Sequence, residues 1–271
     1  MALARRIRRT RQPGRMLLAC LLSLGLVGLV ACGRQGESGA VQIEISHLAG
    51  GAPLQLNSGE YATAAGDRFT VTQLRYYLSN FRLHREGGDW FAVAKDEQGS
   101  AGYFLVDEAQ PASRQFSLEG VPQGRYDGIE FLVGVDDARN HAGAQTGTLD
   151  PTRGLFWTWK SGYIFFLFEG RSPQSPDGQL KFHIGGGAPS TARTVYLPLA
   201  PKAAQLDAHV QPTIHLHADL AELFRGDSEV RFATLHATMG GPDAATLADN
   251  LPGVFRVDHV HNEPPRPKRP S

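Results

Sequence analysis

Short segments in which apolar and polar residues alternate, separated by Gly, Pro, Asn and Asp, recur along most of this chain. The first, VQIEI at residues 41–45, is apolar at every second position, as a strand with one buried face requires. Many short strands with regular turns predict an all-β fold, a β-sandwich that is Ig-like or a partly closed barrel, with one or two short helices. Further strands are expected at 69–71, 103–106, 129–135, 163–168, 194–199, 213–216 and 230–235, helices at 218–224 and 243–251, and either type at 72–80.

The most hydrophobic stretch of the body lies between residues 149 and 170. Trp157 and Trp159 are two positions apart, so on a strand they share a face. The strand expected at 163–168 is apolar on both faces and should therefore lie in the middle of the structure. One face carries Phe165 and Leu167, and the other carries Ile164, Phe166 and Phe168. The tryptophans are either part of the core or an exposed platform for a ligand.

The first 31 residues resemble an export signal. Six arginines precede an apolar run at residues 16–30, which is shorter than the roughly 20 residues a membrane-spanning helix needs. Leu29 stands three positions before Cys32, as in the lipobox of bacterial lipoproteins, where the cysteine becomes the lipidated first residue. We therefore expect a lipoprotein anchored by lipid at Cys32, in the periplasm or at the outer membrane. The alternative is an ordinary signal peptide that ends in cysteine.

The remaining composition limits what the exported body can be. The whole chain has two cysteines, Cys20 inside the apolar run and Cys32 at the expected lipid anchor. The body therefore keeps no free thiol for a disulfide or a metal. Without the six arginines of the signal, 21 Lys and Arg stand against 27 Asp and Glu, which argues against nucleic-acid binding. We expect a flexible tether at 32–40, one domain at 41–262 and a disordered basic tail at 263–271.

Ten histidines, all after residue 32, are the distinctive chemical resource. Two H-x-H pairs occur, at 215–217 and 259–261, and on a strand such a pair projects to one side about 6.6 Å apart. Each pair either converges on a metal ion or lies on a solvated face. His236 stands three residues before Met239, and a thioether beside imidazoles suits copper better than calcium or magnesium.

Taken in order, several segments resemble the MbnP family of exported copper-binding proteins. They are SH at 46–47, APLQLN at 52–57, LRYYLSN at 74–80, LVD at 105–107, VPQGRY at 121–126, GVDDARN at 134–140, GTLDP at 147–151, FWTWKSGY at 156–163, FHIGG at 182–186 and VDHVHN at 257–262. Together they span nearly all of residues 41–262.

The resemblance implies a β-rich protein that binds copper, as Cu(I) or Cu(II), beside a di-haem cytochrome c peroxidase-like partner. In some members this partner oxidises a tryptophan to kynurenine at the copper site. This chain lacks the four-cysteine motif of that branch and has Gly102, Tyr103 and Phe104 where the branch places its tryptophan, which argues against kynurenine there. Trp157 and Trp159 remain as oxidation targets or as an aromatic wall.

The candidate copper ligands rest on the same resemblance. His183, His47 and His259 lie inside matching motifs, and His141 lies on a loop where related chains can carry histidine. His236 and Met239 complete the set, whereas carboxylates are poorer ligands for cuprous ion.

We expect a monomeric copper-binding protein that acquires, stores or delivers the ion at the cell envelope. We expect no enzymatic activity, because the residues name no nucleophile or catalytic base. The alternative is a module that binds a carbohydrate or peptide through its aromatic residues.

Overall fold

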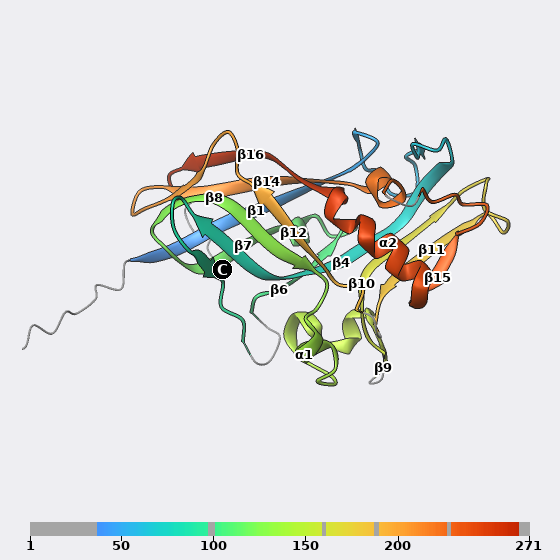
Figure 1. Cartoon of the computed structure of the whole chain (residues 1–271), viewed down its shortest axis with the longest axis horizontal. Coiled ribbons are helices and arrows are strands. Elements are labelled where there is room, and N and C mark those ends of the chain that lie inside the picture. The colour runs from blue at the N-terminus through green and yellow to red at the C-terminus, as the bar shows by residue number, and fades with distance from the viewer. Residues whose placement is uncertain (1–36, 97–100, 159–160, 187–189, 227–228, 266–271) are drawn as a thin grey trace, which may run out of the picture. The chain divides into compact units, whose positions relative to one another are not determined.

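A computed structural model describes residues 37–96, 101–158, 161–186, 190–226 and 229–265 (Figure 1). Cys32 and Trp159 lie outside the described residues. The strands are β1 (Ser38–Ala49), β2 (Ala52–Pro53), β3 (Tyr61–Ala62), β4 (Arg68–Arg85), β5 (Trp90–Ala92), β6 (Tyr103–Asp107), β7 (Gln115–Pro122), β8 (Gly124–Val133), β9 (Phe156–Thr158), β10 (Gly162–Arg171), β11 (Gln179–Gly185), β12 (Arg193–Pro198), β13 (Ala204–Leu206), β14 (Gln211–Asp219), β15 (Ala237–Met239) and β16 (Phe255–Glu263). The helices are α1 (Asp137–Asn140), α2 (Gly241–Val254) and the 3-10 turns η1 (Pro111–Arg114), η2 (Gly147–Leu149), η3 (Pro151–Arg153) and η4 (Leu220–Phe224).

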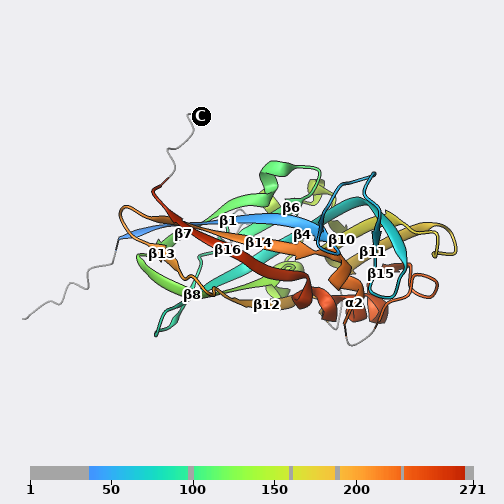
Figure 2. The same ribbon diagram turned by 90° about the horizontal axis from the view of Figure 1, so that it is seen from above.

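The strands form two sheets, and the all-β prediction is confirmed. In the first sheet the order is β16-β14-β1-β2, with β7 also paired to β1, and Figure 2 shows β16, β14 and β1 side by side. In the second sheet the order is β12-β8-β4-β10-β11-β15, with β3, β5 and β6 on β4, β13 on β8 and β9 on β10. The β1–β14 and β11–β15 pairs are parallel, so each joins segments that are far apart in the chain.

The main core lies between the two sheets. Ile43 and Ile214 contribute from the first sheet, and Phe131 and Phe166 from the second. Because side chains alternate along a strand, the other face of each sheet is turned away from this core. Buried residues flank His183 of β11 and His215 of β14, and Val260 is buried between His259 and His261 of β16, so these histidines lie on the outer faces.

A second, smaller apolar cluster covers part of the outer face of the second sheet. Tyr163, Phe165 and Leu167 of β10 enter it, and Trp157 of β9 packs against it. Ile164 also belongs to this cluster, although it was predicted on the face of Phe166. A register shift between Ile164 and Phe166 explains the difference, because a bulge breaks the simple alternation.

Most of the expected elements are found, with changes at their ends. The prediction of a strand at 230–235 was wrong, since among the described residues this segment forms a turn in which Leu235 N donates to the carbonyl of Arg231. The segment 72–80 is part of β4, and α2 extends the helix expected at 243–251. The strand β1 begins at Ser38, inside the expected tether, because Ser38 and Gly39 pair with β7.

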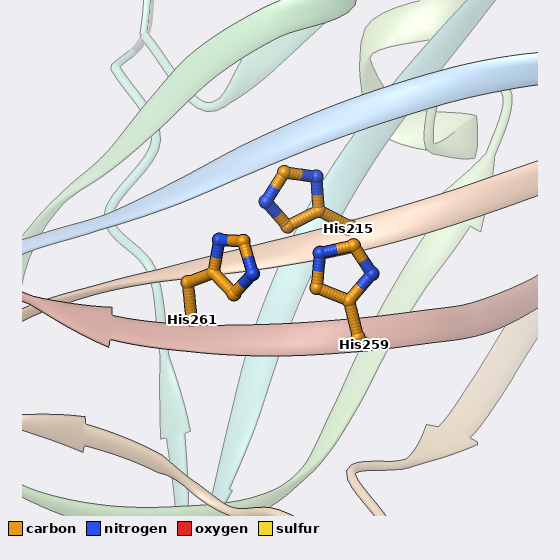
Figure 3. A group of neighbouring side chains, drawn as sticks. All are labelled: His215, His259 and His261. Carbon is orange, nitrogen blue, oxygen red and sulfur yellow. The ribbon is translucent and has the colours of Figure 1, made fainter.

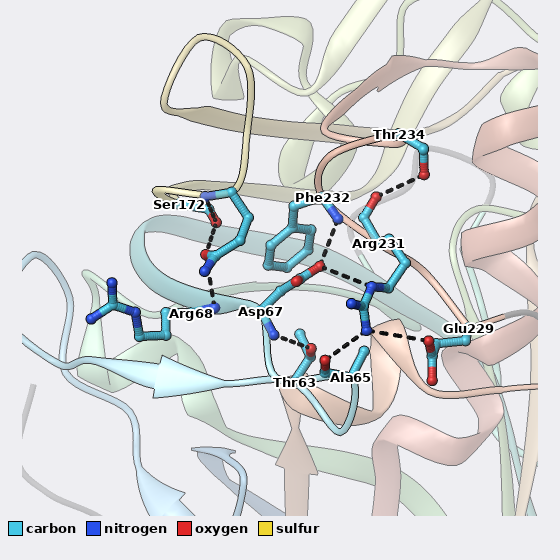
Figure 4. A network of polar contacts seen from close by, with 10 residues as sticks. Thr63, Ala65, Asp67, Arg68, Ser172, Glu229, Arg231, Phe232 and Thr234 are labelled. Atoms are coloured by element: carbon cyan, nitrogen blue, oxygen red, sulfur yellow. Dashed lines mark hydrogen bonds and ion pairs between the residues drawn. The ribbon is translucent and has the colours of Figure 1, made fainter.

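The turn at 229–234 is tied to the loop before β4 by a polar network (Figure 4). Asp67 is 6 % exposed, and its Oδ2 accepts a hydrogen bond of 2.8 Å from the backbone N–H of Phe232. Its own N–H donates to Thr63 Oγ1, and Arg231 Nε lies 3.8 Å from the carboxylate. This network holds the segment that leads directly into β15.

Asp67→Ala is expected to lower the free energy of unfolding by about 1–3 kcal/mol, because it leaves the buried N–H of Phe232 without its acceptor. Arg231→Ala is the control. It removes the ion pair with Asp67 and the hydrogen bond from Nη1 to the carbonyl of Ala65, and because this side chain is half-exposed the loss should cost less than about 1 kcal/mol. Urea unfolding measures both. Equal effects of the two substitutions would contradict this role of Asp67.

Among the described residues, no helix is long and apolar enough to cross a membrane.

Candidate metal centre

His183 and Met239 occupy paired positions on neighbouring strands of the second sheet. They are register partners in the parallel β11–β15 pair, and adjacent strands lie about 4.8 Å apart. Phe182 and Thr238, which precede them, are buried, so both His183 and Met239 project to the outer face. The side chain of His183 is 12 % exposed, whereas Met239 is 66 % exposed. An imidazole and a thioether thus stand side by side at the edge of the sheet.

A carboxylate fixes the orientation of the His183 ring. Glu169 of β10 places Oε1 2.9 Å from His183 Nε2. Because a carboxylate only accepts, Nε2 carries the proton and donates, which leaves the lone pair on Nδ1. A histidine that ligates a metal through one nitrogen commonly donates the other N–H to such a carboxylate.

Trp157 forms a wall at the same end of β11 and β15. A Cβ placed on Gly186 would lie 3.0 Å from its ring, and one on Gly240 would lie 4.0 Å from it. Gly240 directly follows Met239, and Gly186 directly follows β11. Glycine at these two positions lets the indole ring approach the backbone beside the His183–Met239 pair. The ring is half-buried and is covered in part by this packing.

His236 lies near this pair in sequence but at a different level of the sheet. The carbonyl of His236 accepts a hydrogen bond from the N–H of Lys181. His236 is three residues before Met239, which corresponds to about 10 Å of extended chain. Its Nδ1 is buried, and no partner for it is found among the described residues. The structure does not place His236 beside His183.

His47 lies inside the molecule, and both of its ring nitrogens have protein partners. It is 3 % exposed, with Nδ1 2.6 Å from Glu108 Oε2 and Nε2 2.7 Å from the hydroxyl of Tyr76. Burial raises the pKa of Tyr76 well above its usual value, so the hydroxyl stays protonated and donates to Nε2. Nδ1–H then donates to Glu108. This arrangement ties β1 to β4 and leaves no lone pair for a metal.

The other two predicted ligands lie elsewhere. His141 follows α1, is half-exposed, and has Asp137 at 3.7 Å. His259 of β16 lies on the outer face of the first sheet with His215 and His261. Since His183 faces outward from the second sheet and His47 faces the core, the structure does not bring His47, His183 and His259 to a common point.

Sequence reasoning missed Glu169. The sequence did carry a sign of Glu169, because it is the first charged residue after the apolar run of β10. This strand pairs with β11, which carries His183. Which histidine it would meet depends on the β10–β11 register, which the residue pattern alone does not give.

This chain was compared with protein families, with solved structures and with curated proteins. The family model described as MbnP matches residues 38–240. Among solved structures, the MbnP from Methylosinus trichosporium is 18 % identical, with a TM-score of 0.54, and the match covers 83 % of this chain and 99 % of that chain. A comparison with curated proteins gave no match. At 18 % identity the structural match shows a shared fold. The segment that the family model matches includes Trp157, His183 and Met239.

Proposed function

The chain belongs to the MbnP family, and from this premise we propose that it is an exported protein that binds copper and passes it on at the cell envelope. The observation that carries the proposal is the His183–Met239 pair, with its supporting carboxylate and its aromatic wall. These residues lie within the segment that the family model matches. The protein binds an ion and does not turn over a substrate.

The donor set fits cuprous ion. Imidazole nitrogen and thioether sulfur are soft or borderline donors, and a thioether is a poor ligand for the hard cations calcium and magnesium. The second ring nitrogen of His183 is held by Glu169, so the free nitrogen is presented in one orientation. Met239 is 66 % exposed, which leaves the sulfur open to a donor or an acceptor of the ion. Such an open pair suits delivery as well as storage.

Two further parts of the proposal concern the surroundings of the protein. Lipid at Cys32 would hold the body at the membrane surface, in the periplasm or at the outer membrane. A di-haem cytochrome c peroxidase-like protein is the expected partner, and Trp157 is the described tryptophan beside the copper pair.

Metal titration tests the proposal. Tag-free protein is titrated with Cu(I) in the absence of oxygen, against a chromogenic cuprous chelator, and we expect one tightly bound ion per chain. Met239→Leu keeps the apolar volume but removes the sulfur, and it should weaken Cu(I) binding by more than about 100-fold.

His209→Ala is the control, because His209 is an exposed histidine outside the site, and its binding should equal that of the wild type. A wild-type protein that binds no Cu(I), or a Met239→Leu variant with unchanged affinity, would refute the proposal.

A further inference from the structure

Three histidines meet on the outer face of the first sheet, away from the His183–Met239 pair (Figure 3). His215 of β14 is the register partner of His259 of β16, and His261 is two residues further along the same face. The ring centroids lie 4.2, 4.9 and 4.4 Å apart. One nitrogen from each ring lies within 4.8 Å of the others.

A bulge in β16 shapes this group. The partner of His215 is His259, but the partner of the next residue, Leu216, is Val257, so Asp258 is an extra residue. A bulge redirects side chains, and it brings Asp258 to the face of the histidines. Asp258 Oδ2 lies 2.7 Å from His259 Nδ1 and 3.5 Å from His217 Nε2.

Each of the three rings has a carboxylate beside its Nδ1. The distances are 2.7 Å from His259 to Asp258, 3.8 Å from His215 to Glu44, and 3.8 Å from His261 to Glu263. A carboxylate at one ring nitrogen orients a histidine and leaves the other nitrogen as the ligand. In Figure 3, one nitrogen of each ring faces the space between the three rings.

One ring nitrogen of His215 points to a ligand independently of the spacing of the three rings. Its Nε2 is buried, and no hydrogen-bond partner for it is found in the described part of the chain. Buried polar atoms without a partner are rare and call for an explanation. Burial, followed by the nearby His259, lowers the pKa of His215.

We infer that His215, His259 and His261 form a second metal site, which binds a borderline divalent transition-metal ion such as Zn²⁺ or Cu²⁺ through three imidazoles. Metal–nitrogen bonds of about 2.0–2.1 Å require the ligand nitrogens to move inward by less than about 1 Å. The site offers no sulfur, in contrast to the His183–Met239 pair, so it favours borderline ions over cuprous ion. Its fourth position faces solvent.

This inference goes beyond the proposed function and does not depend on it. His259 and His261 lie outside residues 38–240, the part matched by the family model, and the two sites lie on different sheets. The second site can therefore be present or absent whatever binds at His183.

Zinc titration of tag-free protein, followed by competition with a zinc indicator dye, tests the inference. The Met239→Leu variant serves as the background protein, so that the His183–Met239 pair does not contribute to the zinc that is measured. We expect one Zn²⁺ per chain, and His261→Ala and His259→Ala should each weaken binding by more than about 100-fold. Asp258→Asn should weaken it by about 10–100-fold, because it removes the carboxylate that orients His259.

His209→Ala should bind Zn²⁺ as the background protein does. The side chain of His261 is 47 % exposed, so His261→Ala should fold normally, and circular dichroism checks this. Zinc binding that is unchanged in folded His261→Ala, or no stoichiometric zinc in the background protein, would overturn the inference.

Discussion

Phe168→Ala is expected to lower the free energy of unfolding by about 3–5 kcal/mol, the largest effect on stability that we predict. The Phe168 ring is fully buried in the main core. Its centroid lies 6.1 Å from that of Phe69, 5.8 Å from Phe182 and 5.4 Å from Phe224. Alanine would leave a cavity between rings contributed by β4, β11 and η4, which cannot all move inward together. Urea unfolding followed by fluorescence measures the loss.

Phe168→Leu is the matched control, because it retains most of the volume and should cost less than the alanine variant. Phe182 immediately precedes His183, so disorder at Phe168 should also reach the His183–Met239 pair. If Phe168→Ala costs less than about 1 kcal/mol, this group of rings is not the centre of the core.

His47→Ala is expected to lower the free energy of unfolding by about 3 kcal/mol or more, and to leave the copper content unchanged. The substitution leaves the buried Tyr76 hydroxyl without its acceptor, and the Glu108 carboxylate keeps only Arg114 Nη1, at 3.3 Å, as a side-chain partner among the described residues. A buried hydroxyl without a partner costs more than the hydrogen bond itself contributes. Unfolding in urea and copper analysis of the same samples separate the two effects.

Tyr76→Phe is the milder companion, since it removes only the hydroxyl and should cost about 1–3 kcal/mol. Loss of copper from folded His47→Ala would show that His47 is a ligand after all.

The fold could be predicted from the sequence because strand periodicity is local. Residues 41–45 alternate, and 163–168 are apolar on both faces, and these patterns mark strands without knowledge of their neighbours. The turn at 230–235 was mistaken for a strand because Val230 and Phe232 are buried in the core without pairing to a sheet. Burial alone does not distinguish the two.

The candidate sites could be predicted only in part, because they depend on strand pairing. His183 and Met239 were both expected as ligands, but that they are neighbours is known only from the parallel pairing of β11 with β15. His47 was expected beside them on the basis of its motif, and its partner Glu108 is 61 residues away in the sequence. The sequence left open whether each H-x-H pair converges on an ion or lies on a solvated face, because spacing alone does not say which histidines meet. The bulge at Asp258 and the β14–β16 register bring one histidine of the first pair to both of the second.

X-ray absorption at the copper edge, on protein loaded with one equivalent of Cu(I), tests the central claim most directly. Met239 is the one methionine after residue 32, and replacing Cys32 by serine removes the remaining sulfur from residue 32 onward. We predict that the copper has one sulfur and at least one imidazole neighbour, and that the sulfur signal disappears in Met239→Leu. A copper ion surrounded only by nitrogen and oxygen in the Met239-containing protein would contradict the account.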